Sequence, residues 1–362
     1  MNRFVQAGIL VVLLLIAGCA PKAAERQRFF WPPGDARPRI EYLEFFYSDD
    51  DVRRGGEHWL AEAVLGKSQP HKVFSRPHAV AADGKGRVFV SDVAQREVFV
   101  LDRTAHQVRT LKIPNVPQPP FKFPGGLAVD DAGRLFVADS LEGKIIEFGA
   151  DEKAVRGFGK GQLQRPTGLC FDNRLKRLYV VDTGAHQVVA FDGEGKSLGT
   201  FGRRGSGPGE FNFPLDVDVD SEGNLYVLDS MNARVQVLDP QGRFLREFGE
   251  RGTALGSFRI PKALSISPSG HVYVTDSTAN RFVIFDLQGQ YLLSVGGEAQ
   301  VTKGQVTPGG FFLPMGIEVD ANEAIWVVDS LNAMIHKYQY LNDQYLQKHP
   351  IKQGQTFRPP GL

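Results

Sequence analysis

Cysteine is scarce in this chain of 362 residues, which contains only Cys19 and Cys170. Two cysteines cannot build the disulfide framework of a small secreted domain. A surplus of charge is missing as well, since 42 basic residues face 41 acidic ones. That balance excludes the basic surface expected of a nucleic-acid-binding protein, so no nucleic-acid partner is predicted. Helical periodicity is nearly absent too, whereas 40 glycines and 22 prolines fit a protein with many turns.

One unbroken apolar run, Ala7–Ala17, lies near the N-terminus. It is too short to span a bilayer as a helix, which takes about 20 residues, but it suits the core of a signal peptide covering residues 1–18. The following Leu15-Ile-Ala-Gly-Cys19 resembles a bacterial lipobox, whose cysteine becomes the lipid-modified first residue. The alternative is an ordinary signal peptide with an incidental cysteine. We favour the lipobox because Cys19 directly follows Ala-Gly at the end of the apolar run.

The N-terminus therefore predicts a lipid-anchored protein of the cell envelope. Ala20 is not aspartate, which by resemblance to such lipoproteins favours the outer membrane, facing the periplasm, in a double-membraned bacterium. Residues 19–38 are polar, contain proline and lack periodicity, as expected of a tether. With Cys19 lipidated, Cys170 has no disulfide partner, and its strand-like surroundings predict a buried, inert thiol.

An aspartate closes a strand-like apolar run six times along the chain. The intervals are 47, 43, 47, 47 and 53 residues, a period typical of a radial β array. Because no catalytic site needs six copies of its acid, we interpret these residues as structural turn acids: Asp92, Asp139, Asp182, Asp229, Asp276 and Asp329.

The segment LYVLDSMNARVQVLD, residues 225–239, illustrates the unit. Its apolar, β-branched flanks predict two strands, Leu225–Leu228 and Arg234–Leu238. Asp229 to Ala233 then form the connection, where Asp and Asn side chains accept backbone hydrogen bonds and tolerate left-handed backbone. The polar residues of the motif are therefore interpreted as turn chemistry.

Each unit also begins with a proline, which suits the first position of a strand because it lacks a backbone donor. The pattern Pro-x-Gly-Leu/Ile-x-Val-Asp, then Leu-Tyr-Val-x-Asp-Ser-x-Asn-x-Arg-Val, resembles the NHL repeat. The resemblance implies an all-β, six-bladed propeller of four-stranded antiparallel blades in a single domain, 39–362. The six repeats are predicted at residues 74–112, 121–160, 163–202, 211–249, 258–296 and 311–340. Departures exist: the motif asparagine survives only at Asn232 and Asn332.

The last repeat lacks an evident fourth strand. Residues 39–47 or Tyr345–His349 could supply it, and we favour 39–47 because pairing the two chain ends in one blade removes free sheet edges. The segment His58–Leu65 predicts a short helix capping the propeller; membrane-surface contact is the alternative.

Unrepeated polar residues on the first strands mark a candidate ligand site at the channel mouth: His78, Asp216, Asp218, Lys262 and Glu318. No cofactor is predicted, although the carboxylates could hold a single divalent cation such as Ca²⁺. The favoured alternative is that Asp216 pairs with Lys262 of the neighbouring blade, since buried charges are normally paired.

Enzyme classes on this fold receive little support. A His₃ zinc site of the amidating-lyase kind would need several axial histidines, and only His78 lies there. Asp216 and Glu318 faintly resemble a gluconolactonase metal site, without its axial asparagine. The long connections 113–122 and 297–312 are instead typical of recognition loops. We therefore predict a scaffold that binds an envelope protein, peptide or polysaccharide, with a metal-dependent lyase or lactonase as the alternative.

Overall fold

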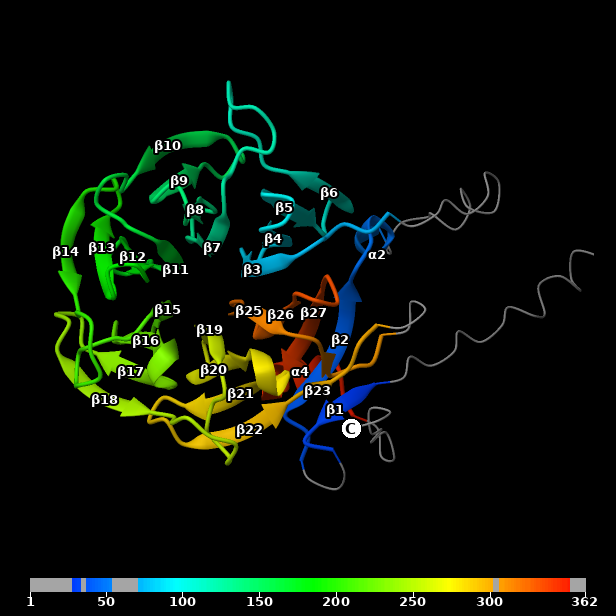
Figure 1. The fold of residues 1–362 in the computed structure, drawn as a ribbon. Coiled ribbons are helices and arrows are strands. Elements are labelled where there is room, and N and C mark those ends of the chain that lie inside the picture. The colour runs from blue at the N-terminus through cyan, green and yellow to red at the C-terminus, as the bar shows by residue number, and fades with distance from the viewer. Residues whose placement is uncertain (1–27, 34–36, 54–70, 302–305, 352–362) are drawn as a thin grey trace, which may run out of the picture.

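The computed structural model of the protein describes residues 28–33, 37–53, 71–301 and 306–351. Figure 1 views them along the axis of a ring of six antiparallel blades, so the predicted all-β, six-bladed propeller is confirmed. The signal peptide, Cys19 and the predicted helix His58–Leu65 lie outside the described residues. No helix among those described is long and apolar enough to cross a membrane.

Five blades are formed by consecutive strands, each beginning at the axis with a proline. The first four of these blades comprise β3 (Pro77–Ala82), β4 (Arg87–Asp92), β5 (Glu97–Asp102) and β6 (Gln107–Thr110); β7 (Pro124–Val129), β8 (Leu135–Asp139), β9 (Lys144–Phe148) and β10 (Ala154–Phe158); β11 (Pro166–Asp172), β12 (Arg177–Asp182), β13 (Gln187–Asp192) and β14 (Ser197–Phe201); and β15 (Pro214–Val219), β16 (Leu225–Asp229), β17 (Arg234–Leu238) and β18 (Phe244–Phe248). The fifth has β19 (Pro261–Ile266), β20 (His271–Asp276), β21 (Arg281–Asp286) and β22 (Tyr291–Val295). Short 3-10 turns, η1 (Ser230–Asn232) and η2 (Ser277–Ala279), join the second and third strands of blades four and five.

The sixth blade contains both ends of the ordered chain. Its strands β25 (Pro314–Val319), β26 (Ala324–Asp329) and β27 (Met334–Tyr340) are joined by β2 (Ile40–Phe46), which pairs antiparallel with β27. The closing strand thus comes from the segment favoured from the sequence. Residues 343–348 form helix α4 (Asp343–Lys348) instead of a strand, with Asn342 capping it by accepting from the Tyr345 amide.

A fifth strand, β1 (Phe29–Trp31), extends this blade by pairing with β2. The predicted tether 19–38 is therefore wrong in its second half. Phe30 and Trp31 are buried, and Arg28 forms an ion pair with the buried Glu41 at 2.7 Å. The free energy gained by burying Phe30 and Trp31 favours a strand here, although nearby prolines are typical of a linker. A five-residue helix, α2 (Asp49–Arg53), follows β2.

The connection 297–312 contains a short parallel pair, β23 (Gly297–Glu298) and β24 (Gly310–Phe311); residues 302–305 within it are outside the described part. The connection 113–122 is the loop projecting from the ring between β6 and β7 (Figure 1).

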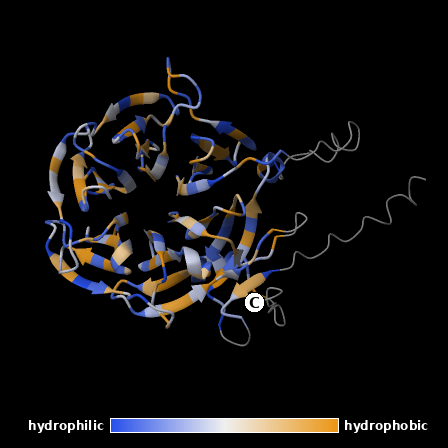
Figure 2. Cartoon of the chain, in the orientation of Figure 1, coloured by the Kyte–Doolittle hydropathy of each residue, from blue (hydrophilic) through white to orange (hydrophobic). Residues whose placement is uncertain are grey.

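The core lies between blades, not within one central cluster. The second strand of each blade is apolar and buried along most of its length, as in Leu225–Leu228, so each blade packs apolar side chains against both neighbours. Apolar segments recur around the whole ring (Figure 2). The third residue after each proline is apolar and buried in every blade: Val80, Leu127, Leu169, Val217, Leu264 and Ile317. This face-to-face packing fixes the inner strands around the axis.

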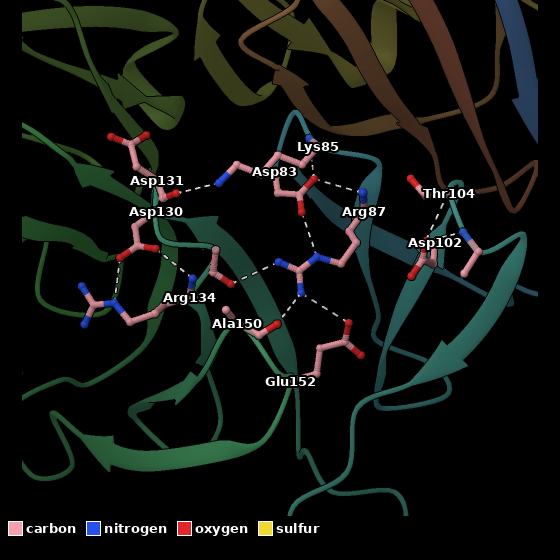
Figure 3. Close-up of polar contacts among 12 residues, drawn as sticks. Asp83, Lys85, Arg87, Asp102, Thr104, Asp130, Asp131, Arg134, Ala150 and Glu152 are labelled. Carbon is pink, nitrogen blue, oxygen red and sulfur yellow. Dashed lines mark hydrogen bonds and ion pairs between the residues drawn. The ribbon is translucent and has the colours of Figure 1, made fainter.

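Polar contacts join the blades on the face away from the prolines. There Arg87 of the first blade binds Asp83 of its own turn and reaches Ala150 O and Glu152 of the second blade (Figure 3). Arg134 likewise binds Asp130, at 2.7 Å, and Glu147. Arg87 and Arg134 are thus held by carboxylates of their own blade, and Arg87 also by one of the next blade.

Candidate functional site: the central channel mouth

The inner strands surround a central cavity of about 350 Å³. Its mouth lies at the proline end of these strands, and every inner strand carries a register shift just after its proline. Such bulges re-aim side chains. The shift lets residues one, two and four positions after the proline line the cavity, while residue three packs between blades.

Basic residues reach the mouth from alternate blades. His78 comes from blade one, Arg165 from blade three and Lys262 from blade five, and all three line the cavity. Blades two, four and six place apolar side chains at the corresponding positions: Phe123, Phe213, Leu215, Leu313 and Met315. The mouth therefore alternates basic and apolar sectors.

These basic groups have no acidic partner in the described part of the chain. No hydrogen bond or ion pair involves the side chain of Arg165 or Lys262, and His78 only contacts the Phe123 ring edge-on at 5.8 Å. Burial lowers the pKa of Lys262, and the nearby Arg165 lowers it further. Burial also lowers the pKa of His78 to about 4, with Lys262 contributing, so this imidazole is neutral at pH 7. The mouth is a site of unneutralised positive potential.

Carboxyl groups lie deeper in the same cavity. Asp216 and Asp218 of β15 each bridge to the next inner strand, accepting from the amides of Leu264 at 3.0 Å and Ile266 at 2.7 Å. Glu318 of β25 lines the cavity without a hydrogen-bond or ion-pair partner among the described residues. Ser265 donates no bond to these acids; its hydroxyl accepts from the Val319 amide.

Burial perturbs all three acids. It raises the pKa of Asp216 to about 8 and that of Asp218 to about 6, partly offset by their backbone hydrogen bonds. Burial, together with Asp218, raises the pKa of Glu318 well above its usual range. Each of these side chains keeps some accessible surface because it faces the channel. Ionising these carboxyl groups together is therefore unfavourable in the deep part of the cavity.

The expected pairing of Asp216 with Lys262 is wrong. No ion pair joins them in the described residues, because the bulge holds Lys262 at the mouth while Asp216 lies one level deeper, against the backbone of β19. Nor does any group of three or more His, Cys, Asp or Glu side chains in the described part have the geometry to hold a metal ion. The single divalent cation is the less favoured interpretation of these residues, and this geometry gives it no support.

The six repeated aspartates hold the turns around the mouth. Each accepts from the amide two residues before the proline of its own blade, at 2.7 to 2.9 Å, for example Asp92 from Ser75 and Asp229 from Asn212. Asp229 also binds Asn232 and Arg234, which in turn donate to carbonyls of the blade crossing at Gly205 and Gly207. The motif's polar residues therefore position the connections between blades, which form the rim of the mouth.

Exposed apolar side chains surround this rim. Leu141, Met231 and Leu331, each two residues after a turn aspartate, are 72%, 53% and 47% exposed. Phe213 and Ile260, directly before the prolines, are 40% and 38% exposed. Because each proline pairs with its blade's aspartate, as Pro214 does with Asp229, these side chains lie on the mouth face.

Arg165 was missed from the sequence. The repeats were compared from the proline onward, and the rim residue of blade three precedes its proline. Comparing the position before each proline, which reads Arg76, Phe123, Arg165, Phe213, Ile260 and Leu313, would have found it. Two other histidines have structural roles: His186 accepts from the Phe213 amide, and His336 is buried against Asp329 and Tyr42.

Comparisons with known proteins agree on the fold. A family model described as a 6-bladed beta-propeller matches residues 162–249. No curated protein matches the chain by sequence.

Three solved structures illustrate the likeness. A structural genomics protein of unknown function from Bacteroides thetaiotaomicron is 20% identical, with a TM-score of 0.60 over 74% of this chain and 70% of that one. An auxiliary nutrient binding protein from the same organism is 14% identical, with a TM-score of 0.58 over 74% and 70%. A catalytically inactive virginiamycin B lyase from Staphylococcus aureus, solved with quinupristin, is 13% identical, with a TM-score of 0.53 over 74% and 95%. At these identities the likeness shows the propeller alone, and the finer resemblance to the NHL repeat stays a prediction.

Proposed function

We propose that this protein is a lipid-anchored propeller of the cell envelope that binds an envelope protein, peptide or polysaccharide through its mouth face, without chemistry of its own. One observation carries the proposal: unpaired basic groups at the cavity mouth are ringed by exposed apolar side chains. A positive centre with an apolar surround is typical of recognition surfaces, where exposed apolar patches mark interaction sites.

The opposite face supports this assignment by contrast. Arg87 and Arg134 on that face are bound to carboxylates within the protein. Charges already paired inside a fold offer little to a partner, whereas unpaired ones steer association. The structurally similar nutrient binding protein makes ligand binding a natural use of this architecture.

Crosslinking at the native membrane, followed by identification of the captured partner, tests the proposal. We expect the double variant Met231→Glu and Leu331→Glu to reduce capture at least tenfold, because it places charge in the apolar rim. The matched control, Leu198→Glu with Leu245→Glu, changes equally exposed leucines on outer strands and should capture as the wild type does.

The alternative of a metal-dependent lyase or lactonase makes the opposite prediction. If replacing Asp216, Asp218 and Glu318 by the amides abolishes the protein's activity while the rim variant retains it, the binding scaffold is refuted.

A further inference from the structure

The levels of the central cavity carry groups of opposite kind, bases at the mouth and carboxyl groups below. Arg165 and Lys262 stand at the mouth, Asp218 and Glu318 line the depth, and Asp216 lies between them. The levels do not neutralise each other: no described ion pair joins them. A cavity with unpaired cations at one end and crowded carboxyls at the other is complementary to a ligand that carries both charges in the reverse order.

The spacing of the two levels limits the ligand's length. Lys262 follows its proline by one residue, while Asp218 and Glu318 follow theirs by four. Three residues of strand rise about 10 Å. A free amino acid is too short to bridge that span, and an extended peptide of about three residues matches it.

The middle level carries few side chains that could fill the cavity. Apart from Asp216, the residues there are small: Ala79, Gly126, Gly168, Ala263 and Gly316. A Cβ on Gly126 would meet Thr167 O at 2.2 Å, and one on Gly316 would meet His78 O at 2.8 Å, so larger residues are excluded by the close approach of neighbouring strands. The cavity has a volume of about 350 Å³, at the lower end of the range for ligand pockets.

We propose that this cavity binds a short zwitterionic peptide of about three residues. Its C-terminal carboxylate lies at Arg165 and Lys262, and its N-terminal ammonium lies at Glu318 and Asp218. The ligand supplies at both ends the opposite charge that the protein lacks, which stabilises groups that burial otherwise disfavours. This site goes beyond capture of an envelope partner by the rim and does not depend on it.

Calorimetric titration of the folded protein at pH 7 and low salt tests the inference, with Ala-Ala-Ala as the probe. N-acetyl-Ala-Ala-Ala lacks the ammonium, and Ala-Ala-Ala-amide lacks the carboxylate. We expect each capped form to bind at least tenfold more weakly than the free peptide. Acetate and inorganic phosphate, which supply an anion alone, should also bind more weakly.

Variants assign the two ends. Lys262→Gln should remove the difference between the acid and the amide, and Glu318→Gln the difference between the free and acetylated amine. Lys196→Gln, at an exposed lysine without a described partner, is the control and should leave both differences intact. Equal affinities for free and capped peptides, stronger binding of the anion alone, or no heat at millimolar peptide would each overturn the proposal. Partner capture at the membrane could still succeed in that case, so the two failures are distinguishable.

Discussion

Carboxyl groups serve two different purposes in this protein, and their neighbours decide which. The repeated turn acids, such as Asp229, are surrounded by amide and guanidinium donors that replace the hydration lost on burial. Glu318 meets none of these among the described residues, although it too lies inside the ring. An ionised carboxylate there loses hydration without compensation, so its negative charge destabilises the fold.

We expect Glu318→Gln to stabilise the protein, increasingly so as pH rises. Because the pKa of Glu318 is raised on folding, the native state binds more protons than the unfolded chain, and wild-type stability falls above the unfolded pKa of about 4.5. The variant has no such loss. Its melting temperature should match that of the wild type near pH 4 and exceed it by roughly 2–4 °C at pH 8, a shift of the size that 1 kcal/mol produces in a domain this large.

Thermal melts from pH 4 to pH 8 provide the measurement, with Glu194→Gln at an exposed turn as the control. An advantage that is constant across pH, or one that grows on acidification, would show that the Glu318 carboxyl is not the cause.

At the scale of elements, the closing strand β2 contributes strongly to the stability of the ring. Ile40 and Phe46 are 0% and 1% exposed, and Phe46 packs against Trp326 at a centroid distance of 5.8 Å. Arg103 of the first blade pairs with Glu44 of β2, so the strand also links blade six to blade one. Without it, β27 would present a free sheet edge and the inter-blade core would open to water.

Deleting residues 39–47 should lower the melting temperature by well over 10 °C, because a whole row of ladder hydrogen bonds and the apolar contacts of β2 are lost together. Differential scanning calorimetry is the measurement. Phe46→Ala, a milder change, should cost about 3–5 kcal/mol, while Leu245→Ala, at an exposed position on β18, should cost little. An unchanged melt after the deletion would remove β2 from this role.

At the scale of the whole molecule, few residues separate the proposed anchor from the ring. Cys19 precedes strand β1 by ten residues, which span at most about 35 Å. A lipid on Cys19 would therefore hold blade six near the membrane surface, since β1 belongs to that blade. The mouth face would then act on partners at or near the same membrane.

Replacing Cys19 by serine should move the protein from the membrane fraction to the soluble fraction and abolish labelling by a fatty-acid analogue, because the thiol that accepts the lipid is gone. Cell fractionation with immunodetection measures this. Cys170→Ser, which removes the buried thiol, is the control and should leave the protein at the membrane. Retention of the Cys19 variant at the membrane would contradict lipid anchoring.

Local periodicity was enough to predict the blades. The recurring proline and aspartate and the hairpin around Asp229 depend on residues close in sequence, and they lie where the patterns placed them. The prediction that residues 39–47, and not 345–349, close the ring rested on the removal of free sheet edges, and β2 confirms it.

Contacts between distant segments decided the rest. Pairing of β1 with β2 is a tertiary contact, and nothing local in a proline-flanked aromatic triplet requires it. The bulge that separates Lys262 from Asp216, and the alternation of basic and apolar sectors at the mouth, exist only once six strands from different parts of the chain surround one axis. Sequence alone determined which residues carry charge. The ring determined which of those charges remain unpaired, because pairing depends on distances between blades that no local pattern specifies.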